Sequence, residues 1–325
     1  MIDTTQGKSL HSKHFVNRSA GFLVLLPAWL LSSCAVFLFS GCARNGPPAQ
    51  VEDTETSGRI TVVAAPEVRG LMGREVQAFM TLYPQARIEL VTGGAREGVA
   101  ALFSQRADLA AVTRELEPEE RSVVVKGGME IEGYRFARDA ICVVVHPSNP
   151  LENISADDLK RVYLGQITRW NELRGGAGTI EPVIPDPEGD LMAAFVQRVM
   201  GGDAPTAPAI RAHGDSEVVA HVRRSRDAIG FVSLAWADSG AKTLNVSSLT
   251  GLPYWKADAE WVYKGDYPLT RFCNLYVRSK GPKLANGLIT FISSRDGQQI
   301  VHEAGLVPTA VPVRFVRRSP MLGMH

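Results

Sequence analysis

Short apolar runs that alternate with helix-like segments constrain the fold of this chain more than any other feature of its sequence. Residues 60–64 (ITVVA) predict a short strand that is buried on both faces. Residues 71–83 then place apolar side chains mostly on one helical face, and Pro84 ends that helix. Another buried strand is predicted at 140–145, and further strands are predicted at 88–91, 108–112, 229–234 and 272–277. This alternation predicts βαβ units with a parallel sheet, so the expected fold class is α/β.

The length and charge of the chain indicate how many domains it has and which kind of partner it lacks. With 325 residues, and at about 150 residues per domain, roughly two domains are expected. Lysine and arginine number 35, aspartate and glutamate number 34, and no long run of one sign occurs. This balance gives no positively charged footprint for a phosphate backbone, so we expect no nucleic-acid partner.

The N-terminal region has the layout of an export signal. Lys8, Lys13 and Arg18 precede residues 21–41, which carry no charge. The uncharged stretch is long enough to be compared with a membrane-spanning helix, which needs about 20 apolar residues. Pro27 within it, and the small residues at its end, favour a cleaved signal. The alternative interpretation is an uncleaved signal anchor.

The end of this stretch predicts a lipid anchor. Residues 39–42 (FSGC) resemble the lipobox of bacterial lipoproteins, which implies acylation of Cys42. Residues 31–34 (LSSC) also fit the pattern, but cleavage there would leave an apolar mature N-terminus. We therefore expect a lipoprotein signal peptide over 1–42 and a flexible tether over 43–58. The protein is expected in the cell envelope, periplasmic or extracytoplasmic, and anchored to a membrane.

The sequence has few patterns typical of metal sites, disulfides or catalytic sites. Cys142 and Cys273 lie outside any CxxC pair, so no metal site is predicted. Export permits a disulfide between them, and two separately buried thiols are an equally good interpretation. The sequence has no Ser/His/Asp arrangement, nucleophile elbow or P-loop. We therefore predict neither an enzyme nor a cofactor.

Six sequence segments occur in the order and spacing of one known family. They include a strand and helix ending in FMTLYP, then ADLAAVTREL, and then ISADDLKRVYLGQITRWNEL. AIGFVSL, YPLTRF and FISSRDGQQIVHEAGLVPT follow. Together they resemble the PstS-type phosphate-binding proteins of ABC transporters, within the type II periplasmic solute-binding protein superfamily.

The resemblance implies a two-lobed type II periplasmic binding protein fold with two hinge-crossing segments. The domain would span 59–318. Lobe one would comprise about 58–138 plus 278–318, and lobe two about 139–277. In such proteins the ligand lies between the lobes, which agrees with the rule that ligands bind outside the carboxyl ends of parallel strands.

The resemblance also indicates where ligand-binding residues would lie. A protein that strips water from phosphate must supply hydroxyls, backbone N–H groups at helix N-termini, or an arginine. The family's Gly-Ser-Ser-Thr loop is residues 64–67 (AAPE) here, so three hydroxyls are absent and Pro66 has no N–H. Its Gly-Ser-Gly-x-Gly turn is residues 94–98 (GAREG), where Ala95 replaces the serine.

A third family segment departs in the same way. Pro185 stands at the position of the family's arginine, and residues 189–191 (GDL) replace Ser-Gly-Thr, so that Leu191 stands where the threonine would be. Thr113 and Arg114 keep the family's chemistry. The residues predicted to bind the ligand are Glu67, Arg96, Thr113, Arg114 and Asp190.

Two of these residues bring negative charge to a site that would bind an anion. A carboxylate about 4 Å from a bound dianion costs on the order of 4 kcal/mol per charge at an effective dielectric near 20. If Glu67 and Asp190 face the cleft, phosphate should bind with a dissociation constant of roughly millimolar or above. The alternative interpretation is that both acids only offset helix dipoles, and that Arg96 and Arg114 are solvated or paired with neighbouring acids.

The sequence therefore predicts an extracytoplasmic solute-binding lipoprotein of the phosphate ABC transporter type. Its ligand would be a small molecule or an anion resembling phosphate, bound in an altered or weakened way. Its partner would be an ABC transporter permease. The alternative is a degenerate interaction module of the envelope that binds no small molecule.

Overall fold

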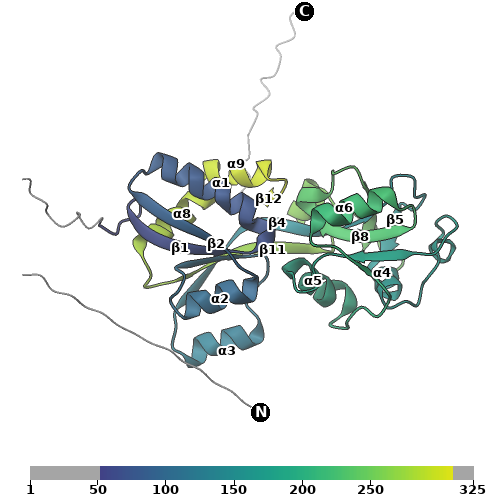
Figure 1. Cartoon of the computed structure of the whole chain (residues 1–325), viewed down its shortest axis with the longest axis horizontal. Helices are drawn as coiled ribbons and strands as arrows, with labels where there is room; N and C mark the ends of the chain where they lie inside the picture. The colour runs from purple at the N-terminus through teal and green to yellow at the C-terminus, as the bar shows by residue number, and fades with distance from the viewer. Residues whose placement is uncertain (1–51, 310–325) are drawn as a thin grey trace, which may run out of the picture. The chain divides into compact units, whose positions relative to one another are not determined.

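The computed structural model describes residues 52–309. The predicted signal peptide, the lipidation site at Cys42, most of the tether and the end of the predicted domain lie outside these residues. The described part forms two groups of helices and strands joined by two long strands (Figure 1). Within it, no helix is both long enough and apolar enough to cross a membrane.

The first group is built on three parallel strands. β1 (Gly58–Ala64) lies between β2 (Ala86–Thr92) and β3 (Leu109–Val112). The strands are connected through α1 (Pro66–Leu82) and α2 (Ala95–Phe103), and β3 is followed by α3 (Pro118–Lys126). The predicted strands and the first helix are therefore present, and the helix begins at Pro66, where a missing N–H costs nothing.

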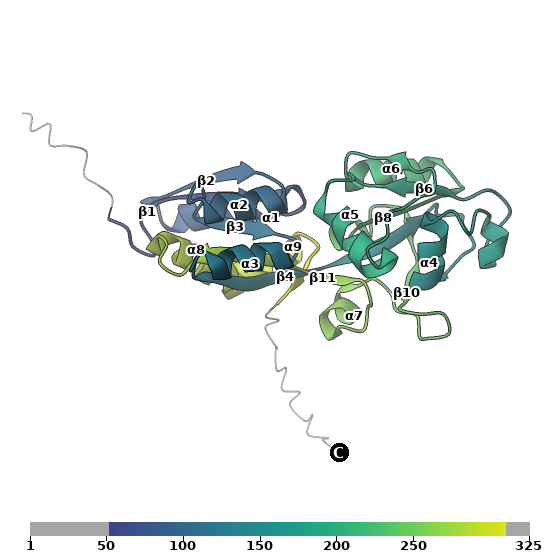
Figure 2. The ribbon, with the colours of Figure 1, turned by 90° about the horizontal axis from the view of Figure 1, so that it is seen from below.

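Two long antiparallel strands carry the chain between the groups. β11 (Thr270–Arg278) pairs with β3 and with the first part of β4 (Ile131–Val145). The last part of β4 pairs with β8 (Ala228–Ser233), so one sheet runs through both lobes in the order β2-β1-β3-β11-β4-β8-β6-β7. Figure 2 shows β4 and β11 side by side between the two sets of helices. The predicted parallel sheet is wrong at these two strands, because each crossing strand runs against its neighbours.

The second group surrounds β8. β6 (Glu181–Ile184) runs parallel to β8 and to β7 (Ile210–Arg211). Its aromatic core contains Phe195, which stacks on Phe231 with ring centroids 4.1 Å apart, and Tyr163, whose ring meets Phe195 edge-on at 4.8 Å. The remaining elements of this group are α4 (Ala156–Tyr163), η1 (Trp170–Leu173), α5 (Asp190–Phe195), the π-helical turn η2 (Val196–Met200), α6 (Asp215–Arg224), η3 (Leu234–Trp236), α7 (Ala259–Lys264), β5 (Asn153–Ser155), β9 (Lys242–Thr243) and β10 (Asn245–Ser247).

After β11 the chain returns to the first group. α8 (Lys283–Ser293) and α9 (Arg295–Glu303) pack with α1, and β12 (Val307–Pro308) pairs with β4. Asp53 accepts hydrogen bonds from the backbone N–H groups of Lys283 and Leu284, at 3.0 and 3.4 Å, at the start of α8. This end of the predicted tether is therefore folded against the domain.

The two cysteines of the domain are free thiols, and both are buried. Cys273 lies opposite Ala137 on β4, whereas Cys142 lies five residues farther along the same strand, opposite Val232. At about 3.3 Å per residue the two thiols are separated by roughly 16 Å along the strand, well beyond the ~7 Å limit for a disulfide between Cα atoms. The interpretation as two separate buried thiols agrees with the structure.

Candidate functional site between the lobes

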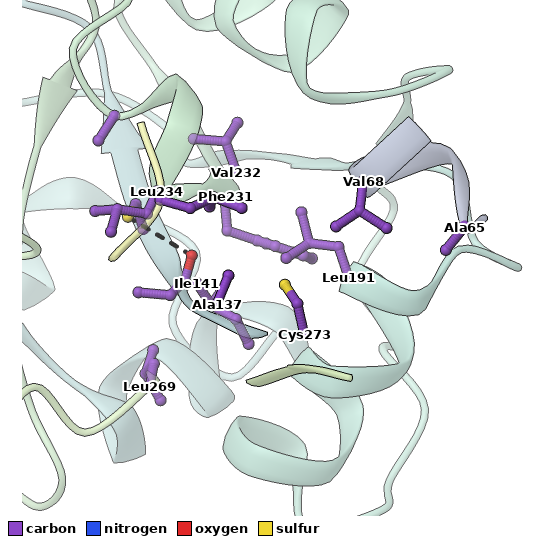
Figure 3. Close-up of a cluster of buried hydrophobic side chains, with 14 of the residues drawn as sticks. Ala65, Val68, Ala137, Ile141, Leu191, Phe231, Val232, Leu234, Leu269 and Cys273 are labelled. Carbon is purple, nitrogen blue, oxygen red and sulfur yellow. Dashed lines mark hydrogen bonds between the residues drawn. The ribbon is translucent and has the colours of Figure 1, made fainter. Parts of the chain in front are cut away.

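The ends of several elements meet where β4 and β11 cross between the lobes. Ala65 and Val68 from the start of α1 lie near Leu191 from the start of α5 and Cys273 from β11 (Figure 3). All four are buried, and they belong to one continuous apolar cluster that extends through both lobes. The position at which the family would hold its ligand is therefore lined partly by packed apolar side chains.

Three of the predicted binding residues come together here and contact one another. The Thr113 hydroxyl, at the end of β3, donates to Asp190 Oδ2 at 3.0 Å. The backbone N–H of Leu191 donates to Glu67 Oε1 at 3.2 Å. Each bond joins an element of lobe one to the N-terminus of α5 in lobe two. Carboxylates of the protein thus accept hydrogen bonds from donors that a bound anion would use.

The backbone N–H groups at the N-terminus of α1 are likewise bonded to groups of the protein or missing. The N–H of Ala65 donates to the carbonyl oxygen of Ala111 at 2.8 Å, and Pro66 has no N–H to give. The N–H of Glu67 is hydrogen-bonded to the carboxylate of the same residue. The positive end of this helix, which suits an anion, already faces the Glu67 carboxylate.

Sequence reasoning missed a buried ion pair at the centre of this site. Arg271 on β11 lies directly opposite Asp139 on β4. Its Nε donates to Asp139 Oδ2 at 2.8 Å, its Nη2 lies 2.6 Å from the same oxygen, and its Nη1 donates to Thr113 Oγ1 at 3.3 Å. The other Asp139 oxygen accepts from the hydroxyl of Ser233 and the N–H of Leu234, both at 2.9 Å. We call Glu67, Thr113, Asp139, Asp190 and Arg271 the interlobe centre.

The electrostatics of the interlobe centre are acidic. Burial raises the pKa of Glu67, and Asp190 adds to the rise while Arg271 opposes it. Burial and the neighbouring Asp139 raise the pKa of Asp215, at the start of α6, to about 7. For Arg271, burial disfavours the charge, but the Asp139 and Glu67 carboxylates outweigh it and raise the pKa.

Three carboxyl groups, those of Glu67, Asp139 and Asp215, interact with the charge of Arg271, and Asp190 is connected to it through the Thr113 hydroxyl. Glu67 Oε2 is buried without a hydrogen-bond partner. Despite this concentration of acids, the described residues contain no group of side chains arranged to hold a metal ion. The excess of acids is unfavourable for an incoming dianion such as phosphate.

The side chains of the two predicted arginines pair with acids outside this centre. The side chain of Arg96 is 84% exposed and lies 3.6 Å from Glu117. Arg114 makes a bidentate pair with Glu120, with both contacts at 2.7 Å. Arg96 is therefore largely solvated and Arg114 is paired, and the acids beside them are Glu117 and Glu120 at the start of α3 rather than their sequence neighbours Glu97 and Glu115.

A signal for the missed residues was present in the sequence. Asp139 and Arg271 are charged residues beside apolar strand runs, in the segments RDAICVVV and TRFCNLYV, although Arg138 precedes Asp139. A charge in a strand that is otherwise buried indicates a partner, because an unpaired buried charge is too costly. Which residue is the partner depends on the register of two strands that are far apart in the chain.

Comparison with known proteins agrees with this architecture. A family model described as the PBP superfamily domain matches residues 49–296. The curated phosphate-binding protein PstS of Bacillus subtilis is 22% identical over 288 residues, which is 88% of this chain and 92% of that protein. The protein of the same name from Pseudomonas aeruginosa is 22% identical over 310 residues, covering 89% and 95% of the two chains.

A solved structure shows the same fold. The crystal structure of an ABC-type phosphate transport receptor from Vibrio cholerae matches with a TM-score of 0.67 and 22% sequence identity, covering 76% of this chain and 99% of that chain. The predicted two-lobed α/β fold is thereby confirmed. Because the family model spans well over half of the sequence, this chain belongs to the PBP superfamily, and it is similar to the PstS-type proteins within it.

Proposed function

We propose that the protein is an extracytoplasmic solute-binding lipoprotein of the phosphate ABC transporter type, and that it binds phosphate itself only weakly. Relatives named phosphate-binding protein PstS, aligned along nearly nine-tenths of the chain, support the class of function. The likeness to an ABC-type phosphate transport receptor supports a transporter permease as partner. The lipobox-like residues 39–42 support lipidation at Cys42 and anchoring to the membrane.

One observation supports weak phosphate binding. The protein's own carboxylates already accept the hydrogen bonds that the donors of the interlobe centre can make. The Thr113 hydroxyl bonds Asp190, and the Leu191 N–H bonds Glu67. A phosphate ion could reach these donors only by displacing both carboxylates. The helix N-termini and the hydroxyl that suit an anion are thus present, but carboxylates of the protein itself occupy them.

The size of this effect follows from the two bonds. A hydrogen bond to a charged group contributes about 1.5–3 kcal/mol, so displacing two costs about 3–6 kcal/mol. Since 1.4 kcal/mol corresponds to a factor of ten, affinity for phosphate falls by about 10²- to 10⁴-fold. A micromolar binding protein would become one with a dissociation constant of about 0.1–10 mM.

Isothermal titration of the full-length protein with phosphate at neutral pH tests this proposal. The wild type should bind with a dissociation constant of about 0.1–10 mM. Glu67→Gln should bind more tightly because it removes a negative charge next to the donors. Glu188→Gln, at an exposed glutamate just before α5, is the matched control and should behave as the wild type. Micromolar binding by the wild type that Glu67→Gln hardly changes would show that the carboxylates do not block the site.

A further inference from the structure

A large cavity opens beside the interlobe centre and is lined from both lobes. Its volume is about 1070 Å³, and Thr113 and Arg271 lie on its wall. One side is formed by the loop between β3 and α3, and the other by α5, η2 and β7. Figure 1 shows α5 facing α2 and α3 below the two crossing strands. Ligand pockets typically measure about 300–1,000 Å³, so this cavity suits a molecule much larger than phosphate.

More arginines than glutamates line the cavity. Five arginines and three glutamates contribute to its lining. Three of the arginines already have partners: Arg114 pairs with Glu120, Arg135 with Glu115, and Arg271 with Asp139.

The side chains of the other two, Arg198 on η2 and Arg211 on β7, have no hydrogen-bond or ion-pair partner among residues 52–309. Both residues are exposed to solvent at the cavity wall, so their guanidinium groups are available to pair with a ligand. Arginine also matches carboxylate and phosphate groups through two parallel hydrogen bonds. Two such side chains on one wall therefore point to a ligand with two negative charges.

The cavity also offers apolar contact. Met192 and Phe272 lie on its wall, and the guanidinium of Arg135 stacks over the Phe272 ring at 4.2 Å. A small inorganic ion would leave these surfaces and most of the volume in contact with water. A ligand with a carbon skeleton would cover them.

We propose that this cavity binds an organic dianion, of the dicarboxylate or phosphate-ester kind, whose charged groups pair with Arg198 and Arg211 while its carbon skeleton contacts Met192 and Phe272. The inference rests on the proposed function as a solute-binding protein and names the class of solute. It places that solute beside the interlobe centre, whose own donors the Glu67 and Asp190 carboxylates already occupy.

Titration of the full-length protein with three probes tests the inference. Glutarate represents the dicarboxylates, glycerol 3-phosphate the phosphate esters, and inorganic phosphate is the comparison. At least one organic probe should bind more tightly than inorganic phosphate. Arg198→Gln and Arg211→Gln should each weaken that probe by about 10- to 100-fold, because each removes a charged hydrogen-bonding partner.

Arg224→Gln, at an exposed arginine on α6 outside the cavity, is the matched control and should leave affinity unchanged. Because both tested arginines are solvent-accessible, thermal melts should show that the variants stay folded. Failure of both organic probes, or binding that either variant leaves unchanged, would overturn the assignment. The phosphate titrations of Glu67→Gln probe the interlobe centre separately, so failure of this inference is distinguishable from failure of the proposed weak phosphate binding.

Discussion

Replacing the buried Glu75 by glutamine should change how the stability of the protein depends on pH. Glu75 lies in the middle of α1, where its residue is fully buried and neither carboxyl oxygen has a hydrogen-bond partner. Burial raises its pKa from 4.5 to about 8, and Arg74 opposes this only in part. At neutral pH the folded protein therefore holds a neutral carboxylic acid at this position, whereas the unfolded chain holds a carboxylate.

The sign and size of the effect follow from proton linkage. Between the unfolded pKa near 4.5 and the folded pKa near 8, unfolding releases one proton from Glu75, so raising the pH favours the unfolded state. The free energy of unfolding falls by about 1.4 kcal/mol per pH unit in that window. From pH 5 to pH 7.5 the loss is about 3 kcal/mol, which is large against the 5–15 kcal/mol that is typical of folded proteins.

Urea unfolding of the full-length protein, followed by circular dichroism at pH 5 and at pH 7.5, measures this contribution. Glutamine fills nearly the same space and does not titrate. The stability of Glu75→Gln relative to the wild type should therefore rise by about 3 kcal/mol between the two pH values. Glu89→Gln, at an exposed glutamate on β2, is the matched control. Parallel pH profiles for Glu75→Gln and the wild type would mean that Glu75 ionises in the folded protein much as it does in water, and the reasoning would fail.

Three further outcomes are expected. Cys42→Ala should move the protein out of the membrane fraction or stall its processing; a mutant that fractionates and migrates like its parent would refute lipidation. Arg271→Met should destabilise the protein by about 3–5 kcal/mol in urea unfolding, because it leaves Asp139 buried without its partner, whereas Arg59→Gln at an exposed site should cost almost nothing. Asp215→Asn should reduce the loss of stability as pH rises from about 4 to 7, since the raised pKa of Asp215 makes the folded state bind the extra proton; an unchanged profile would contradict that pKa.

The elements that could be predicted from sequence are those specified by local patterns. The apolar run of β1 and the helix that follows it were predictable because periodicity and Pro84 act over a few residues. The Ser155 cap of α4 is equally local, and its hydroxyl accepts the N–H of Asp158 at 3.1 Å. The directions of β4 and β11 were not predictable in this way, because they depend on pairing between segments more than 100 residues apart in the chain.

In the candidate site, the positions of some residues could be predicted from sequence, whereas their contacts could not. Glu67, Thr113 and Asp190 could be located because each follows a strand or begins a helix, and such positions meet at one edge of the sheet. Their partners could not be inferred from local pattern. Sequence reasoning placed the two carboxylates opposite a ligand, whereas the structure shows them bonded to Thr113 and to the backbone of Leu191. The pairing of Asp139 with Arg271 depends on strand register, which no single segment reveals.

The contacts of the interlobe centre also bear on how the lobes are held together. In a binding protein that closes around its ligand, closure depends on contacts that the ligand makes to both lobes. Here Thr113–Asp190 and Glu67–Leu191 join the lobes directly, and Val68 and Leu191 lie in one apolar cluster. A solute can shift the balance between open and closed forms only through contacts that differ between them. A solute must therefore make contacts other than these two bonds. The arginine-lined cavity is formed by both lobes, and its unpaired arginine side chains can make such contacts with a solute.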